Sequence, residues 1–152
     1  MYVKRKKEKN RRRRARKRMI CRVASNIRRC SPLVITGKAR TVFLKGLCDR
    51  LSCKGMIKNH GILSAENVHT SLIQAFADKR VAEWRNSMLE RDAVIIEQFE
   101  YFAGKRCAQE ELLSVLKEVK SPIVISSAVL IDADNGFINE LADFFSKGTI
   151  LK

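Results

Sequence analysis

A dense run of positive charge occupies the N-terminus of this chain and limits what the chain can fold into. Residues 1–18 contain twelve Lys or Arg residues and one acidic residue, Glu8. A segment of this composition cannot bury apolar surface, so we expect a disordered tail there and a core built from the remainder. That remainder is nearly neutral, with thirteen basic and eight acidic residues in 19–102, and six and seven in 103–152.

The net charge of +15 and a pI near 10.1 indicate a polyanionic partner. Arginine-dense segments neutralise phosphates and release counterions, so we interpret the tail as a nucleic-acid-binding segment. There are two alternative roles for the tail: it serves only as a nuclear import signal, or it attaches the protein to an acidic membrane surface. The charge does not distinguish DNA from RNA. The candidate phosphate contacts in the tail are Arg11, Arg12, Arg13, Arg14, Arg16, Lys17 and Arg18.

The cysteines and histidines do not follow the spacing of a metal site. The five cysteines are odd in number, and no pair has the C-x-x-C spacing. Cys48, Cys53 and His60 are spaced loosely like metal ligands, but the second pair of a zinc finger is missing. We therefore interpret the cysteines as reduced core thiols and expect no metal and no cofactor.

The sequence also lacks the patterns of an enzyme or an integral membrane protein. No nucleophile–base pair, phosphate-binding glycine loop or paired-carboxylate setting stands out from solvated surface, so we expect no catalytic activity and no small-molecule substrate. No apolar run approaches the roughly 18 residues that a membrane span requires, and we expect no membrane partner.

Apolar periodicity predicts an all-helical body that is interrupted only near Pro32 and Pro122. Ser64 is a predicted N-cap, with Glu66 in the first turn of the helix that follows. Gly46 and Gly55 each weaken the predicted helix over 36–59 by about 1 kcal/mol relative to alanine. This cost is tolerable if the apolar face of the helix is buried, or if the glycines let another helix approach closely. The predicted helices span 19–29, 36–59, 64–76, 78–102, 108–119 and 126–146.

An internal repeat supports a duplicated architecture. Residues 31–36 (SPLVIT) match residues 121–126 (SPIVIS) at an offset of 90, with four identities and two conservative exchanges. Each copy follows a short predicted helix and precedes a long one. Repeats of this kind indicate two equivalent structural units.

The order of short helix, loop, long helix, loop and short helix resembles the histone fold. Residues 35–39 (ITGKA) and 63–70 (LSAENVHT) resemble the first and second loops of histone 2B. In the second copy, residues 115–119, 125–127, 135–141 and 147–150 resemble segments of the same fold. Two such units in one chain resemble the fused 2B–2A histone doublets of large DNA viruses.

This resemblance implies an all-α histone fold with an extra C-terminal helix and a partial second histone-fold repeat. The implied domains are the disordered tail (1–18), a first unit with the extra helix (19–102) and a partial second unit (103–152). The implied function is sequence-independent binding and compaction of DNA in nucleosome-like particles, in a nucleus, on a chromosome or in a virion. The implied partners are double-stranded DNA and other histone-fold proteins, of the histone 3–histone 4 type or 2A-like.

Histone pairing brings the first loop of one unit beside the second loop of the other, where helix N-termini and small hydroxyls bind phosphates. Plain N-capping is the alternative role of the hydroxyl groups. The implied DNA contacts are Thr36, Gly37 and Lys38 with Lys147, Gly148 and Thr149; Ser126 and Ser127 with Gly61 and Ser64; and Arg22, Arg28 and Arg29 on the first helix.

A small basic RNA-binding protein, ribosomal or viral, is the competing hypothesis. Such a protein would use the arginine-rich tail on folded RNA and the helical body for oligomerisation. Aromatic residues are not interleaved with arginine in the tail, so the stacking platforms that bind single strands are missing.

Overall fold

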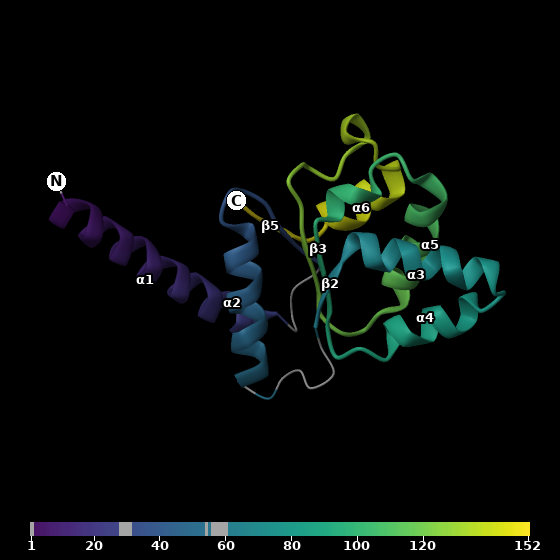
Figure 1. The fold of residues 1–152 in the computed structure, drawn as a ribbon, viewed down its shortest axis with the longest axis horizontal. Helices are drawn as coiled ribbons and strands as arrows, with labels where there is room; N and C mark the ends of the chain where they lie inside the picture. The colour runs from purple at the N-terminus through teal and green to yellow at the C-terminus, as the bar shows by residue number, and fades with distance from the viewer. Residues whose placement is uncertain (1, 28–31, 54, 56–60) are drawn as a thin grey trace.

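The computed structural model describes residues 2–27, 32–53, 55 and 61–152 and shows a mixed α/β fold (Figure 1). Five strands form one parallel sheet in the order β2-β3-β4-β1-β5. The elements in chain order are α1 (Tyr2–Asn26), β1 (Leu33–Ile35), α2 (Arg40–Cys53), β2 (Ile62–Ser64), α3 (Ala65–Ala77), α4 (Val81–Leu89), β3 (Val94–Glu97), the 3-10 helix η1 (Phe99–Phe102), α5 (Arg106–Glu118), β4 (Ile123–Ser126), the 3-10 helix η2 (Ala133–Asn135), α6 (Asn139–Ser146) and β5 (Thr149–Leu151).

The interior strands are short, continuous apolar runs. Strands β1, β3 and β4 contain the segments LVI, VII and IVI, and every residue of these segments is buried. Parallel strands covered on both faces have this composition because neither face meets water. Pairing is in register, with Leu33 opposite Val124 in β4 and opposite Thr149 in β5.

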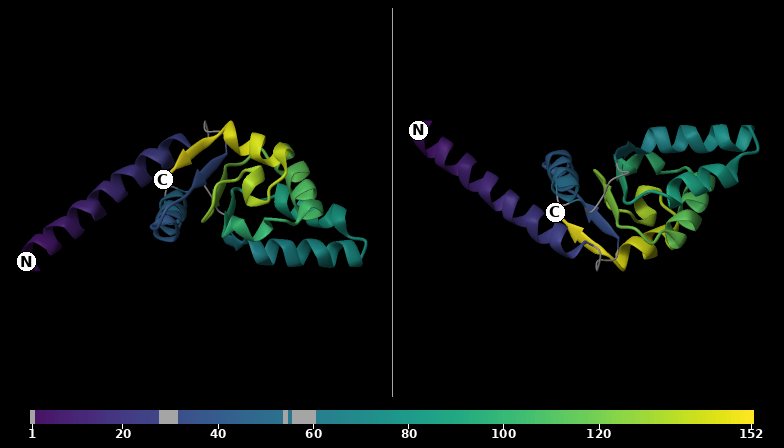
Figure 2. Two further views of the ribbon diagram at one scale, coloured as in Figure 1. Left: turned by 90° about the horizontal axis from the view of Figure 1, so that it is seen from above. Right: turned by 90° about the horizontal axis from the view of Figure 1, so that it is seen from below.

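Helices cover both faces of the sheet and enclose two separate cores (Figure 2). On one face, α1 and α2 pack over Leu33, Ile35 and Ile95. On the other face, α3, α4, α5 and α6 enclose a larger core that includes Val34 and Ile96. Successive strand residues thus alternate between the two cores, as the period of two in a strand requires.

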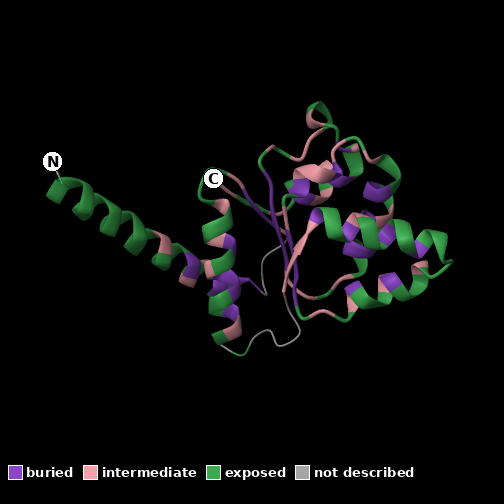
Figure 3. Cartoon of the chain, viewed as in Figure 1, coloured by how far each residue is buried: buried purple, intermediate pink, exposed green. Residues whose placement is uncertain are grey.

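Helix α1 joins the body only through its C-terminal part and projects away from it (Figures 1 and 2). Ile20 and Ala24 are buried near its end, and Ile27 just beyond it, whereas residues 2–15 are exposed (Figure 3). A Cβ atom at Gly46 of α2 would lie 2.6 Å from Cδ1 of Ile20, so this glycine permits the close approach of the two helices.

The all-α histone fold expected from the sequence is wrong, because the apolar runs at 94–96 and 123–125 form strands. The predicted helix over 78–102 is α4, β3 and η1, and the predicted helix over 126–146 is the end of β4, a loop, η2 and α6. Helix α2 begins at Arg40 and ends at Cys53; residues 54 and 56–59 lie outside the described part of the chain. No histone unit or second histone repeat is present in the described residues.

Two local predictions are confirmed. The Ser64 side chain caps α3 by accepting a hydrogen bond from the Asn67 backbone N–H at 3.1 Å. Helix α5 spans Arg106–Glu118, close to the predicted 108–119. Both rest on local signals, a capping residue and a strong amphipathic stripe, that do not depend on the rest of the fold. None of the helices described is both long and apolar enough to cross a membrane.

Candidate functional site

The carboxyl ends of β1, β3 and β4 lie at the edge of the sheet where a fold of this type usually binds a ligand. Helix α2 follows β1 on one face of the sheet, and α6 follows β4 on the other, so the connections leave these two neighbouring parallel strands toward opposite faces. Ligands bind at such switch points in open α/β sheets. The residues placed at this edge are Thr36 and Gly37 after β1, Gln98 after β3, and Ser127 after β4.

The loop between β1 and α2 bonds mainly to the chain itself. The backbone N–H and the hydroxyl group of Thr36 both donate to the Leu151 carbonyl, at 2.7 and 3.1 Å. The Arg40 guanidinium donates to the Gly37 carbonyl at 3.0 Å. Gly37 has a φ of 92°, the left-handed conformation that favours glycine.

A hollow of about 330 Å³ lies beside this loop, and most of its lining is apolar. Three cationic side chains stand among the apolar ones. The lining residues are Met19, Ile35, Thr36, Gly37, Lys38, Ala39, Arg40, Phe43, Leu151 and Lys152. Its volume suits a small ligand, but few polar groups converge on it.

The ends of β3 and β4 offer few free polar groups. The Glu100 carboxylate accepts a hydrogen bond from the Ala128 backbone N–H at 3.0 Å. The Ser127 hydroxyl donates to the Val129 carbonyl at 2.6 Å and is fully buried. Gln98 has a φ of 56°, a strained conformation for a residue with a side chain. Across the described ranges, no three His, Cys, Asp or Glu side chains gather as metal ligands.

The first predicted pair of loops is not brought together. Parallel pairing sets Leu33 opposite Thr149 and Ile35 opposite Leu151, so residues 36–38 and 147–149 lie at opposite ends of the β1–β5 pair. Strands rise by about 3.3 Å per residue, which separates the two segments by roughly 10 Å. Gly148 lies against the Pro32 carbonyl instead, and Thr149 donates its backbone N–H to that carbonyl at 3.0 Å.

The second predicted pair of loops is also separated. Ser126 ends β4 and Ser64 ends β2, and β3 lies between these strands. Gly61 precedes β2 and therefore lies toward its other end. Ser126 and Ser127 are 2% and 0% exposed, so their hydroxyl groups face the protein interior rather than solvent.

The predicted basic contacts lie on α1. Eight of them are placed along this helix, and all but Arg16 are exposed; the eight are Arg11, Arg12, Arg13, Arg14, Arg16, Lys17, Arg18 and Arg22. Arg12 forms an ion pair with Glu8, the one acidic residue of the helix. Arg28 and Arg29 lie outside the described residues. A 25-residue helix is about 37 Å long, and α1 thus presents an elongated cationic surface.

The cysteines occupy separate environments. Cys48 is buried in α2, and burial, followed by the nearby Asp49 carboxylate, raises the pKa of its thiol. Cys53 and Cys107 are exposed, and Cys21 is half-buried. Cys30 and His60 lie outside the described residues, so the loose Cys48–Cys53–His60 spacing has no structural counterpart to examine.

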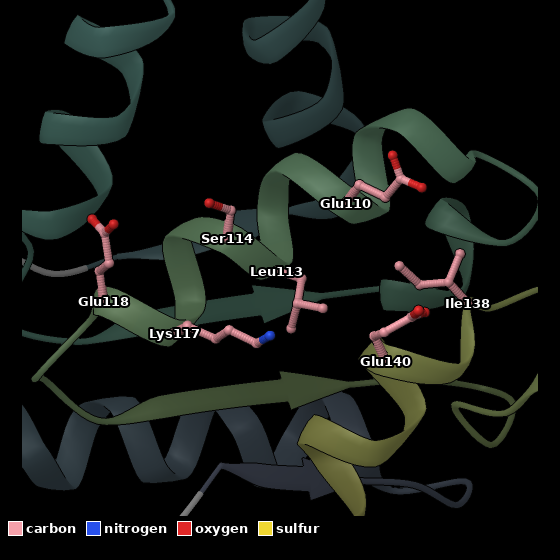
Figure 4. Close-up of a pocket in the computed structure, with 7 residues that line it drawn as sticks. All are labelled: Glu110, Leu113, Ser114, Lys117, Glu118, Ile138 and Glu140. Atoms are coloured by element: carbon pink, nitrogen blue, oxygen red, sulfur yellow. The ribbon is translucent and has the colours of Figure 1, made fainter.

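A second hollow, of about 450 Å³, lies between α5 and α6, away from the sheet edge. Figure 4 shows Leu113 and Lys117 of α5 facing Ile138 and Glu140. Glu110 and Glu118 add further negative charge, and Glu118 forms an ion pair with Arg85 of α4 at 3.1 Å. Three carboxylates against one ammonium group make this surface acidic, and it repels phosphates.

Sequence reasoning did not identify the sheet edge as a site. The available signal was a set of three apolar triplets, each followed by polar residues: Thr36 and Gly37, Glu97 and Gln98, Ser126 and Ser127. Because the carboxyl ends of parallel strands meet at one edge, such triplets place their following residues together. Reading the triplets as parts of helices concealed this relation.

Comparisons with known proteins agree on one family. The sequence model of the family described as the bacterial DnaA ATPase domain matches residues 7–152. The chromosomal replication initiator protein DnaA of Magnetococcus marinus is 31% identical over 68 residues, which are 43% of this chain and 15% of that protein.

Two solved structures share the fold. Domain III of the Thermotoga maritima replication initiation protein DnaA aligns with a TM-score of 0.80 and 21% identity, over 90% of this chain and 60% of that chain. A replication initiator DnaA bound to AMPPCP and single-stranded DNA aligns with a TM-score of 0.75 and 16% identity, over 87% and 43%. The chain therefore spans only part of each of these proteins.

These matches overturn the histone interpretation. A bacterial replication-initiator family replaces the histone family, and with it the expectations of nucleosomes, chromatin, histone partners and a nuclear or virion location. The competing prediction of a ribosomal or viral RNA-binding protein is wrong for the same reason. The error arose because the whole body was predicted to be helical, and its short loop motifs were then compared with the loops of histones.

Proposed function

Because this chain belongs to the bacterial DnaA ATPase-domain family, we propose that it is a DNA-binding domain of the replication-initiator type, with α1 as its contact to duplex DNA. The family supports a role at the bacterial chromosome, since the relatives it matches are named as replication initiators. One of these relatives is described as bound to single-stranded DNA.

The charge of α1 carries this proposal. The helix contains thirteen Lys or Arg residues and one Glu, and it projects from the body as a single rod. Outside residues 1–26 the basic and acidic residues nearly balance, so α1 dominates the field that a polyanion meets. Each phosphate neutralised by such a helix releases counterions, which favours binding at moderate salt.

Duplex DNA fits α1 better than a single strand does. Proteins that bind single strands stack bases on aromatic side chains, and Tyr2 is the one aromatic residue in α1. The helix therefore offers charge without stacking platforms. Duplex DNA has the higher linear charge density, and a purely electrostatic contact gains more from it.

The test is fluorescence anisotropy of the full chain with a labelled duplex and with a single strand of the same sequence, across a salt series. We expect tighter duplex binding, with log K falling linearly in log salt at a slope of about −0.9 per contacted phosphate. The double variant Arg13→Glu/Arg14→Glu should weaken duplex binding and reduce the size of that slope by about 0.9 for each phosphate that is no longer neutralised.

A charge-matched variant controls for net charge. Lys79→Glu/Arg80→Glu changes the total charge equally, in the exposed turn between α3 and α4. It should leave the salt slope unchanged. Equal weakening of duplex binding in both double variants, or tighter binding of the single strand than of the duplex, would contradict the proposal.

A further inference from the structure

The family is described as an ATPase domain, so the loop after β1 can be compared with the phosphate-binding loop of nucleotide-hydrolysing proteins. That loop follows a strand, opens a helix and has the pattern G-x-x-x-x-G-K-[ST]. Its glycines let backbone N–H groups surround the phosphates, its Lys reaches the outer phosphates, and its Ser or Thr binds the magnesium ion. The equivalent segment here is the β1–α2 loop.

No alignment of this loop satisfies the pattern. If Gly37 is the first glycine, Val42, Phe43 and Leu44 stand at the positions of Gly, Lys and Ser/Thr. Leu44 is fully buried in the core, and Val42 is an exposed apolar side chain. If Arg40 and Thr41 take the Lys and Ser/Thr positions instead, the two glycine positions fall on Ala39 and on Val34, a buried residue of β1. The connection between β1 and α2 has only four residues, 36–39, and is too short for the loop.

The polar groups of the loop bind the chain itself. Thr36 donates twice to the Leu151 carbonyl and thereby fixes the end of β5 beside β1. The Arg40 guanidinium bonds to Gly37 within the same loop. A Cβ atom on Gly37 would be in van der Waals contact with the Lys152 backbone at 3.4 Å, so the residue that follows β5 lies directly against this glycine.

The metal side of the site retains a carboxylate, so the case against a nucleotide rests on the loop. A magnesium ion in such proteins is held by the loop Ser or Thr together with an Asp at the end of a neighbouring strand. Here β3 ends in Glu97, and the next residue is the neutral Gln98. The Glu100 carboxylate already accepts a hydrogen bond from the Ala128 backbone N–H, just after β4. Among the described residues at this edge, Glu97 is the one carboxylate that does not bond to the end of β4.

We propose that this chain does not bind a nucleoside triphosphate at the carboxyl edge of its sheet, and that the β1–α2 loop instead anchors β5 through Thr36. The domain therefore catalyses no ATP hydrolysis, and its affinity for DNA does not depend on nucleotide. The nucleotide claim stands on the loop geometry and does not require that α1 binds DNA.

The first test is titration of the full chain with AMPPCP and Mg²⁺, followed by thermal unfolding. We expect no saturable binding and no rise in Tm. The AMPPCP-bound replication initiator serves as the positive control. A nucleotide present at a hundred times its Kd would raise the Tm of a domain this size by about 5–10 °C, and a rise of that size would overturn the proposal.

The duplex-binding assay separates this inference from the proposed function. Equal duplex affinity with and without AMPPCP supports nucleotide independence, and a several-fold change overturns it. If the chain binds no duplex at all, the proposed function fails, while the titration still decides the nucleotide question.

Two hydroxyl variants test the anchoring role. Thr36→Val removes the hydroxyl bond to Leu151 and should lower the Tm by about 2–4 °C. Thr41→Val alters the exposed hydroxyl that a magnesium site would need and should leave the Tm unchanged. A Thr36→Val variant as stable as Thr41→Val would overturn the anchoring role.

Discussion

At the scale of single residues, one buried amide joins three parts of the larger core. Gln109 is fully buried in α5. Its amide nitrogen donates to the carbonyls of Phe102 and Gly136, at 2.6 and 2.9 Å, and its oxygen accepts from the Ile138 backbone N–H at 2.8 Å. The two carbonyls have further donors in Lys105 and Gly104, whereas Gln109 is the acceptor for Ile138. The side chain therefore fixes the entry to α6.

Replacing Gln109 with leucine should destabilise the protein by about 1–3 kcal/mol. Leucine keeps most of the volume but leaves the part-buried Ile138 N–H without its acceptor, and an unsatisfied group of this kind costs about 1–3 kcal/mol. Chemical unfolding measures the change. Gln74→Leu is the control, since Gln74 is exposed on α3 and its amide bonds to the exposed Asp78 carboxylate, and it should change stability by less than about 0.5 kcal/mol. Equal stability of the two variants would contradict the role of Gln109.

The Cys48 thiol predicts a pH dependence. Burial and Asp49 raise its pKa above the ordinary thiol value, and Arg91 opposes them. Because the folded-state pKa lies above the unfolded one, the contribution of Cys48 to stability is complete below about pH 8.5 and is lost as the pH rises through the folded value. The free energy of unfolding should fall less steeply in this alkaline window in Cys48→Ala than in the wild type. Cys53→Ala, at an exposed position, should retain the wild-type slope.

At the scale of elements, the internal repeat had a structural cause that the sequence did not reveal. Its two copies form β1 and β4, which are neighbours in the sheet. Pro32 and Pro122 precede these strands, and each offers its carbonyl to a neighbouring strand, to Thr149 and Val94 respectively. Three aliphatic residues follow in each copy and alternate between the two cores. The copies are alike because parallel strands buried on both faces impose the same demands on sequence.

The same short runs explain why the predicted helices were too long. Three consecutive apolar residues fit a buried strand and a helix equally well, and only flanking signals separate the two. Between Trp84 and Phe102 the apolar spacings imitate a helical stripe, although α4 ends at Leu89 and β3 begins at Val94. Where the first turn was capped, as in α3, or the amphipathic stripe was strong, as in α5, the helix was predicted correctly. Strand order and sheet edge, which depend on contacts distant in sequence, could not be predicted.

At the scale of the whole molecule, the chain divides into a charged rod and a nearly neutral body. From charge alone, the sequence predicted a disordered basic tail that ends at residue 18. The structure shows the basic segment as part of α1, and its first buried side chain is Ile20. The residues before that position contribute charge, whereas Ala24 and Ile27 contribute apolar surface to the core against α2. Function and stability should therefore separate along one helix.

Two deletions test this separation. Removal of residues 2–18 should change the Tm by no more than about 2 °C, because surface residues outside packed contacts contribute little, while it should abolish the salt-dependent duplex binding. Removal of residues 2–27 also strips Ile20, Ala24 and Ile27 from the core. Burying an isoleucine contributes about 1.5–3 kcal/mol, so this deletion approaches the roughly 5–15 kcal/mol that stabilises a typical domain. We expect that variant to lose cooperative unfolding.

Ile27→Ala provides a milder check, with an expected cost of about 2–5 kcal/mol measured by urea unfolding. If the shorter deletion destabilised the protein as much as Ile27→Ala, residues 2–18 would be part of the folded core, and the boundary would have to move toward the N-terminus.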